Sequence, residues 1–251
     1  MSGHSKWSTI KRKKGAADAK RGAIFTRLAR EIAVAAREGG GDADSNFRLR
    51  LAVDKARAEN MPKDNIERAI KRGSGDDKDG TAYEEIMYEG YGPKGVAMMI
   101  ETVTDNRNRS VSEIRHTLSR SGGSMAEVGS VSWQFERKAY FAFPASELDY
   151  DKAFELAIEA GADDVTEEDD MVEIIGPVES FKAIANLLHK AKVNPEDAEL
   201  RMVPKQEMEL DINDTLHVIK VIESLEEMDD VQNVYSNLKM SEDALAALEA
   251  E

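Results

Sequence analysis

Phosphate binding is the chemistry that the opening residues of this 251-residue chain suit best. The chain begins MSGHSKWSTIKRKKGAADAKRG, and seven of its first 21 residues are Lys or Arg, whereas only Asp18 is acidic. The seven cations are Lys6, Lys11, Arg12, Lys13, Lys14, Lys20 and Arg21. Ammonium and guanidinium groups neutralise phosphate charge, so this run predicts a polyanion-binding arm. The alternative is a solvated basic face that binds no ligand.

The charge of the rest of the chain makes this arm unusual. The whole chain has a formal net charge of −15. Residues 1–75 hold 18 basic and 9 acidic residues, a net of +9, and the remainder holds 16 basic and 40 acidic residues, a net of −24. Such a division predicts a polyanion-binding end on a body that repels polyanions.

A second set of donors lies in the stretch TDNRNRS, residues 104–110, which connects a predicted strand to a predicted helix. Arg107 and Arg109 alternate there with Asn106 and Asn108. Helix N-termini favour anions, and the planar guanidinium fork suits phosphate, so we include both arginines in the predicted nucleic-acid-binding set. The alternative is a helix cap with solvent-facing arginines.

Several stretches resemble catalytic or ligand-binding motifs, but their neighbouring sequence or their spacing does not fit the chemistry of those motifs. GYGPKG at 90–95 matches a dinucleotide fingerprint, but a strand-like run follows it where a helix is needed, so a hairpin turn is favoured. DDKDG at 76–80 lacks the ligand spacing of a calcium loop, and TEEDD at 166–170 is typical of a solvated acidic turn. The histidines are scattered at His4, His116, His189 and His217. We therefore expect no catalytic residue, no metal site, no cofactor and no small-molecule substrate.

Composition narrows the class of protein. The chain has no cysteine, which excludes disulfides and thiolate nucleophiles and fits a reducing compartment. No apolar run reaches the ~18 residues that a membrane-spanning helix needs, and the basic start has no apolar signal segment. We expect a cytoplasmic protein that does not bind membranes.

The first predicted helix must position the arm. Apolar residues recur at helical spacing until Gly39, at Ile24, Leu28, Ile32 and Ala35. A neighbouring stripe is basic and carries Lys20, Arg27, Arg30 and Arg37. We therefore add Arg27 and Arg30 to the predicted binding set. The alternative is that these arginines only solubilise a surface helix.

Two more helices complete a predicted bundle over residues 1–80. One runs over about 44–59, where Asp44 or Ser45 can cap it, and Phe47, Leu51 and Ala58 lie along one side. The other follows Pro62 and ends at Gly73. The polar stretch 73–80 is the predicted linker.

Beyond the linker, the spacing of apolar residues changes from that of helices alone to that of strands alternating with helices. We predict strands at 96–103 and through Val131, Trp133 and Phe135, with a helix between them. Residues 138–205 contain a complete split βαβ pattern, and 206–240 adds one helix and one strand. The fold class is therefore α+β. The predicted domains are 1–80, a discontinuous domain of 81–137 with 206–251, and a domain of 138–205 inserted into it.

Several of these stretches together resemble the YebC/PmpR family. They are MSGHSKWSTIKRKKGAADAKRG, NMPKDNIERAIKRGSG, YEGYGPKGVAMMIETVTDNRNRSVSEIRH and GSVSWQFERK. The resemblance covers essentially the whole chain. It implies a helical bundle and two ferredoxin-like α+β domains, one inserted in the other, and nucleic-acid binding without known catalysis.

The resemblance leaves the target of binding open. Family members are described either as DNA-binding transcriptional regulators or as translation factors at the ribosome that ease synthesis through difficult stretches such as consecutive prolines. The leading interpretation is a DNA-binding regulator, and the alternative is a ribosome-associated factor that binds rRNA. An adaptor whose acidic body docks a basic protein is a further alternative.

Overall fold

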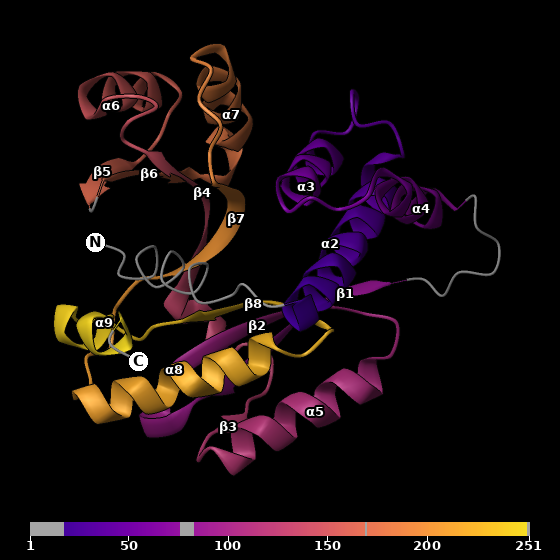
Figure 1. Cartoon of the computed structure of the whole chain (residues 1–251). Coiled ribbons are helices and arrows are strands. Elements are labelled where there is room, and N and C mark those ends of the chain that lie inside the picture. The colour runs from indigo at the N-terminus through magenta and orange to yellow at the C-terminus, as the bar shows by residue number, and fades with distance from the viewer. Residues whose placement is uncertain (1–17, 76–82, 169, 250–251) are drawn as a thin grey trace. The chain divides into compact units, whose positions relative to one another are not determined.

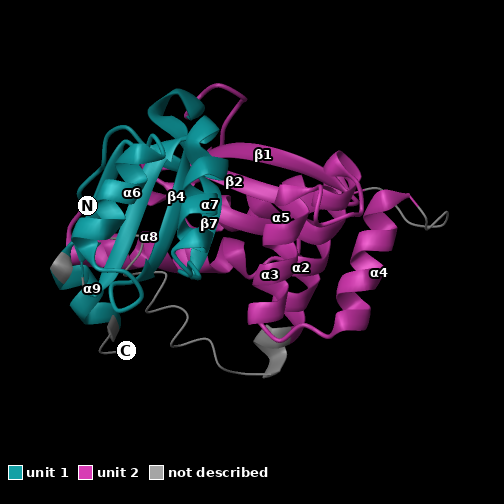
Figure 2. Cartoon of the chain, turned by 90° about the horizontal axis from the view of Figure 1, so that it is seen from above, with its two compact units in different colours: residues 1–10, 132–209, 237–251 teal, residues 11–131, 210–236 magenta. Residues whose placement is uncertain are grey.

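A computed structural model describes residues 18–75, 83–168 and 170–249. These residues fall into two compact units (Figure 2). Among described residues, unit 1 contains 132–209 and 237–249, and unit 2 contains 18–131 and 210–236. No helix in the described ranges is both long and apolar enough to span a membrane.

Three helices begin unit 2, as the sequence predicts: α2 (Asp18–Gly39), α3 (Phe47–Ala58) and α4 (Lys63–Ser74). Their shared core contains Leu28, Ile32, Ala35, Leu49, Val53 and Ile66. α4 crosses α2 closely, because a Cβ added at Gly73 would lie 2.1 Å from the carbonyl oxygen of Ala33. The missing side chain of Gly73 therefore sets the distance between the two helices.

α3 buries a different stripe from the apolar residues Phe47, Leu51 and Ala58, and the predicted cap, Asp44 or Ser45, is wrong. The helix buries Leu49, Ala52, Val53 and Ala56, while Phe47 and Leu51 are half-buried and Ala58 is exposed. The cap is Asn46, whose side chain accepts a hydrogen bond from the Leu49 amide at 3.1 Å. The 49/52/53/56 spacing forms one narrow helical stripe, and this stripe competes successfully with the 47/51/58 stripe for the core.

The sheet of unit 2 has the strand order β3-β1-β2-β8. Its strands are β1 (Glu84–Tyr91), β2 (Ala97–Thr104), β3 (Ser124–Met125) and β8 (Val231–Ser236), and each pairs antiparallel with its neighbours. Helices α5 (Arg107–Arg120) and α8 (Ile212–Glu226) lie side by side on one face of the sheet (Figure 1).

GYGPKG forms the hairpin turn that the sequence predicts. It joins β1 to β2 through the short 3₁₀ turn Pro93–Gly95, in which Lys94 and Gly95 have φ values of 60° and 82°. β1 is not predicted from the sequence, although a hairpin requires a strand on both sides. Its segment EEIMYEGY carries charges and a glycine that lower its apparent strand character.

Unit 1 contains the predicted split βαβ pattern. Its sheet has the order β5-β6-β4-β7, and all neighbours are antiparallel. The elements are β4 (Phe135–Pro144), α6 (Tyr150–Glu159), β5 (Asp164–Glu168), β6 (Met171–Pro177), α7 (Phe181–Lys190), β7 (Asp197–Pro204) and, near the end of the chain, α9 (Glu242–Glu249). The neighbour order is that of a ferredoxin-like sheet, and α6 and α7 lie together on one of its faces (Figure 1).

The predicted strand through Val131, Trp133 and Phe135 is wrong. Val131 is buried at the end of a loop, residues Ser132–Gln134 form a 3₁₀ turn, and Phe135 begins β4 of the second sheet. Glu89 holds this loop, because its buried carboxylate accepts hydrogen bonds of 2.7 Å from the amides of Gly129 and Val131. The alternation of apolar and polar residues therefore reflects a turn and a strand start.

The three predicted domain boundaries stay a prediction. The chain forms three strands of the unit 2 sheet, then the whole unit 1 sheet, and then returns to add β8 to the first sheet. The compact units group the chain differently from the predicted domains, and residues 132–137 and 206–209 fall into one unit with the second sheet. Helices α2–α4 fall into one unit with the first sheet, and α9 falls into one unit with the second.

Candidate nucleic-acid interface

The basic arm lies largely outside the described residues. Lys6, Lys11, Arg12, Lys13 and Lys14 precede residue 18, so their predicted role stays a prediction. Lys20 and Arg21 belong to the first turn of α2, and their side chains also lie outside the description. The described part of the interface therefore begins at Arg27.

Arg27 and Arg30 of α2 are both directed towards the turn between α8 and β8. Arg27 Nη1 donates to the carbonyl oxygen of Glu226 at 3.2 Å. Arg30 is 8% exposed, its Nη1 lies 2.8 Å from Asp230 Oδ1, and it also donates to the carbonyl oxygen of Asp229. Arg30 is thus neutralised inside the protein and does not offer a free charge to a ligand.

Asp230 is the centre of a polar cluster that the sequence analysis missed. Its side chain is 4% exposed. Oδ2 accepts hydrogen bonds from Thr104 Oγ1 at 3.0 Å, Ser110 Oγ at 2.7 Å and Arg109 Nη2 at 2.8 Å. These donors come from the end of β2 and the first turn of α5, while Arg30 comes from α2. We call this set, Asp230 with Arg30, Thr104, Arg109 and Ser110, the Asp230 cluster.

The Asp230 cluster stabilises the ionised carboxylate. Burial alone raises the pKa of Asp230, but the hydrogen bonds from Ser110, Arg109 and Thr104 and the charge of Arg30 outweigh burial, so the pKa lies below the ordinary value. The hydrogen bonds to Asp230 and Asp105 in turn raise the pKa of the Arg109 guanidinium, although its partial desolvation opposes this. Asp230 and Arg109 therefore stabilise each other in the ionised form.

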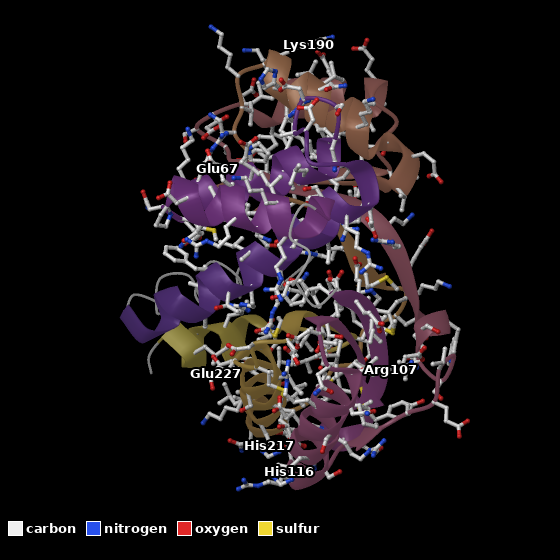
Figure 3. All side chains as sticks on the ribbon, turned by 90° about the vertical axis from the view of Figure 1, so that its right-hand side faces the viewer. Glu67, Arg107, His116, Lys190, His217 and Glu227 are labelled. Atoms are coloured by element: carbon white, nitrogen blue, oxygen red, sulfur yellow. The ribbon has the colours of Figure 1, made fainter. Side chains whose placement is uncertain are left out.

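The two arginines of 104–110 have different surroundings. α5 begins at Arg107, and the Asn106 side chain caps it by accepting from the Arg109 amide at 3.1 Å. The Arg109 guanidinium contacts Asp230 and also Asp105, at 3.0 Å. Arg107 is exposed and forms no ion pair with any described residue (Figure 3). Asn106 therefore caps the helix, and of the two arginines only Arg107 has a guanidinium that no described carboxylate pairs with.

Further exposed cations on α5 were not singled out from the sequence. Arg115, His116 and Arg120 are exposed. His217 of α8 lies with its Nε2 3.2 Å from the carbonyl oxygen of Ser121, directly after α5, and Figure 3 labels His116 and His217. Glu113 is the single acidic residue within α5. The spacing of these arginines was visible in RNRSVSEIRHTLSR, but their exposure depends on which stripe faces the sheet, and that stripe is Ser110, Ile114 and Leu118.

The glycine-rich turn offers no phosphate loop. Its one cation, Lys94, forms an ion pair of 3.0 Å with Asp214 at the beginning of α8. The residue that would contact a nucleotide phosphate is thus already paired with a carboxylate. Among described residues, no group of three His, Asp or Glu side chains is arranged to hold a metal ion.

Two family profiles match the chain. The profile described as TACO1/YebC protein N-terminal domain matches residues 5–76, and the profile described as TACO1/YebC second and third domain matches residues 83–238. A crystal structure titled as a conserved hypothetical protein, Aq1575, from Aquifex aeolicus is similar with a TM-score of 0.83 and 43% identity. The similarity covers 90% of this chain and 93% of that chain.

Relatives of known name match over nearly their full length. A protein of Geotalea uraniireducens named "Probable transcriptional regulatory protein" is 53% identical over 245 residues, 98% of each chain. A protein of Chlorobaculum parvum with the same name is 50% identical over 252 residues, 100% of each chain. The chain therefore belongs to the TACO1/YebC family, in agreement with its resemblance to YebC/PmpR proteins.

Proposed function

We propose that the protein is a non-enzymatic, nucleic-acid-binding regulator of gene expression that holds phosphates through its basic N-terminal arm and α2. The single observation that carries this proposal is the charge division, with a net of +9 in residues 1–75 and −24 in the remainder. The net negative charge of the whole chain repels a polyanion, so a localised cationic segment is needed to bind one. The relatives are named as probable transcriptional regulatory proteins, which favours a role in transcription.

The Asp230 cluster separates the predicted binding residues into those whose charge is paired inside the protein and those that can contact phosphate. Arg30 and Arg109 are positioning residues, because their charges are held by Asp230. Arg27 has no described carboxylate partner and is half-buried, and Arg107 is exposed. We therefore propose that phosphate contacts come from the arm, Lys20, Arg21, Arg27 and Arg107. Arg115 and Arg120 extend this set along α5.

The contacts proposed are to phosphates, which fix position and carry no sequence information directly. Trp7 is the one aromatic residue within the basic arm, so base stacking has few candidates there. This favours a second candidate function, binding of structured rRNA by a ribosome-associated translation factor. Phosphate-dominated, shape-reading contacts suit folded RNA as well as duplex DNA.

A gradient experiment tests the proposal and separates its two forms. Lysate is fractionated under low salt, and the protein is followed through the gradient together with rRNA and DNA. Co-migration with ribosomes supports translation, and enrichment of particular DNA fragments supports transcription. A protein that stays at the top of the gradient and binds neither purified ribosomes nor duplex DNA would contradict nucleic-acid binding.

A further inference from the structure

Helix α6 of unit 1 has its larger apolar side chains on the outside. Ala153 and Ala157 are its buried residues, whereas Phe154 and Ile158 are 43% and 45% exposed. A helix that served only the core would bury its larger apolar residues and expose small or polar ones. The exposed pair therefore calls for another explanation than core packing.

The exposed Phe154 and Ile158 continue a ridge that begins at the half-buried Tyr150. Tyr150, Phe154 and Ile158 follow one another at intervals of four, so they line up along one side of the helix. The Tyr150 and Phe154 ring centroids lie 6.1 Å apart, and Tyr150 Oη donates to the carbonyl oxygen of Val165 in β5 at 3.2 Å. We call these three residues the α6 ridge. It runs beside β5, which is an edge strand of its sheet.

Carboxylates flank the α6 ridge. Asp151, Glu155 and Glu159 form a parallel line one residue further around the helix, and all three are exposed. The adjacent edge strand adds the exposed Asp164, Glu167 and Glu168. Residues 149–168 contain eight acidic residues and one basic residue, Lys152, which pairs with Asp149 at 3.8 Å. The ridge is thus apolar at its centre and negative around it.

We propose that the α6 ridge is a docking site for a Lys/Arg-rich protein segment that carries an apolar side chain. The apolar side chain would cover Phe154 and Ile158, and the cations would meet the flanking carboxylates. The same carboxylates repel nucleic acid and anionic lipid, and they would repel each other if a second copy docked through the same face. This site goes beyond the proposed function, because it adds a protein partner at a surface that phosphates avoid.

Peptide binding to the full chain tests the proposal. The probe is a fluorescent amphipathic peptide of Leu and Lys, compared with one in which Ser replaces every Leu. We expect the wild-type protein to bind the Leu–Lys peptide more tightly. The double variant Phe154→Ala, Ile158→Ala should lower that affinity by about tenfold or more. It should leave the weak binding of the Ser–Lys peptide unchanged.

Two controls locate the effect. Ile212→Ala removes a side chain of equal exposure, 43%, on α8 in unit 2, and should leave peptide affinity unchanged. The variant Glu155→Gln, Glu159→Gln should flatten the salt dependence of Leu–Lys binding, while Glu113→Gln, Glu227→Gln should not. Circular dichroism confirms that each variant is folded. Equal losses for the ridge and the Ile212 variants, or no preference for the Leu–Lys peptide, would overturn the proposal.

Other occupants of the ridge give distinct results. If a second copy covers it, sedimentation will show a wild-type dimer that dissociates in the Phe154→Ala, Ile158→Ala variant. If the chain's own arm covers it, Lys11→Ala, Arg12→Ala, Lys13→Ala, Lys14→Ala will bind the Leu–Lys peptide at least about tenfold more tightly than wild type. Either result would overturn the proposal that a separate basic protein segment binds the α6 ridge. The proposed nucleic-acid function would be unaffected by both.

Discussion

Arg30 of α2 and Asp230, directly before β8, form a buried ion pair, with Nη1 and Oδ1 2.8 Å apart and side chains 9% and 4% exposed. Buried charges are stable only when they are paired and hydrogen-bonded. Thr104, Ser110 and Arg109 complete the hydrogen bonds of the carboxylate. The pair therefore fixes the helix that carries the basic arm to the sheet of unit 2.

Removing the carboxylate should destabilise unit 2. Asp230→Ala leaves Arg30 buried without its counter-charge, so we expect a loss of about 3 kcal/mol or more in the free energy of unfolding, measured by urea denaturation. Asp54→Ala is the matched control, because Asp54 pairs with Arg57 on the exposed side of α3. That variant should lose no more than about 0.5 kcal/mol. Similar losses in both variants would show that the Asp230 cluster contributes no more than a surface pair.

The same cluster predicts a pH dependence. The pKa of Asp230 is lowered in the folded protein, so its contribution to stability is complete above the unfolded-state pKa and is lost as the pH falls through the folded-state value. Wild type should therefore exceed Asp230→Asn in stability by a constant amount above about pH 5. The difference should shrink steadily below about pH 4, as seen in denaturation curves at successive pH values. A difference that does not change with pH would contradict the ionised carboxylate.

Arg107 and Arg109 should behave differently although they are two residues apart. Arg107→Ala should change the unfolding free energy by at most about 0.5 kcal/mol and reduce the slope of log affinity against log salt on duplex DNA by about 0.9. Arg109→Ala removes hydrogen bonds to a buried carboxylate and should cost about 1–3 kcal/mol of stability. Denaturation and salt titration of the two single variants test this, and interchanged results would refute the assignment.

Two glycines offer a test of the helix packing in unit 2. A Cβ at Gly73 would overlap the Ala33 carbonyl oxygen at 2.1 Å, so Gly73→Ala should destabilise by about 1–3 kcal/mol. Gly22 lies within α2, and apart from its own neighbouring backbone nothing lies within 4 Å of an added Cβ. Gly22→Ala should therefore stabilise the helix by about 0.5–1 kcal/mol. Thermal unfolding measures the change in stability of each variant relative to wild type. The two changes should have opposite signs, and equal signs would contradict the packing described.

The sequence predicted local features of the fold well. Apolar periodicity placed α2, and the hairpin at GYGPKG and the split βαβ pattern of unit 1 are confirmed. The charged residues and the glycine of β1 obscure its strand pattern, so the sequence does not predict it. Residues 131–135 alternate between apolar and polar side chains as a strand does, but they form a turn followed by the start of β4. These errors come from weak local signals that tertiary pairing overrides.

The candidate site was less predictable because its organisation depends on distant contacts. Arg30 and Arg109 looked like phosphate-binding residues, since a basic side chain has the same local pattern whether it faces solvent or a buried carboxylate. Asp230 lies in the acidic stretch EEMDD and carries no local signal that separates it from its neighbours. The pairing of β8 with β2 brings it to Arg109, and the packing of α2 against β2 brings it to Arg30.

The salt dependence of nucleic-acid binding tests the central claim most directly. The measurement compares wild type with the full-length variant Lys11→Ala, Arg12→Ala, Lys13→Ala, Lys14→Ala on duplex DNA, single-stranded RNA and ribosomes. If each of the four residues neutralises a phosphate, the slope of log K against log salt should flatten by up to about 3.6 on duplex DNA and about 2.8 on single strands. The loss should be similar for every sequence, because phosphate contacts position rather than specify. An unchanged slope on all three ligands would contradict the account and leave the basic arm a solubilising segment.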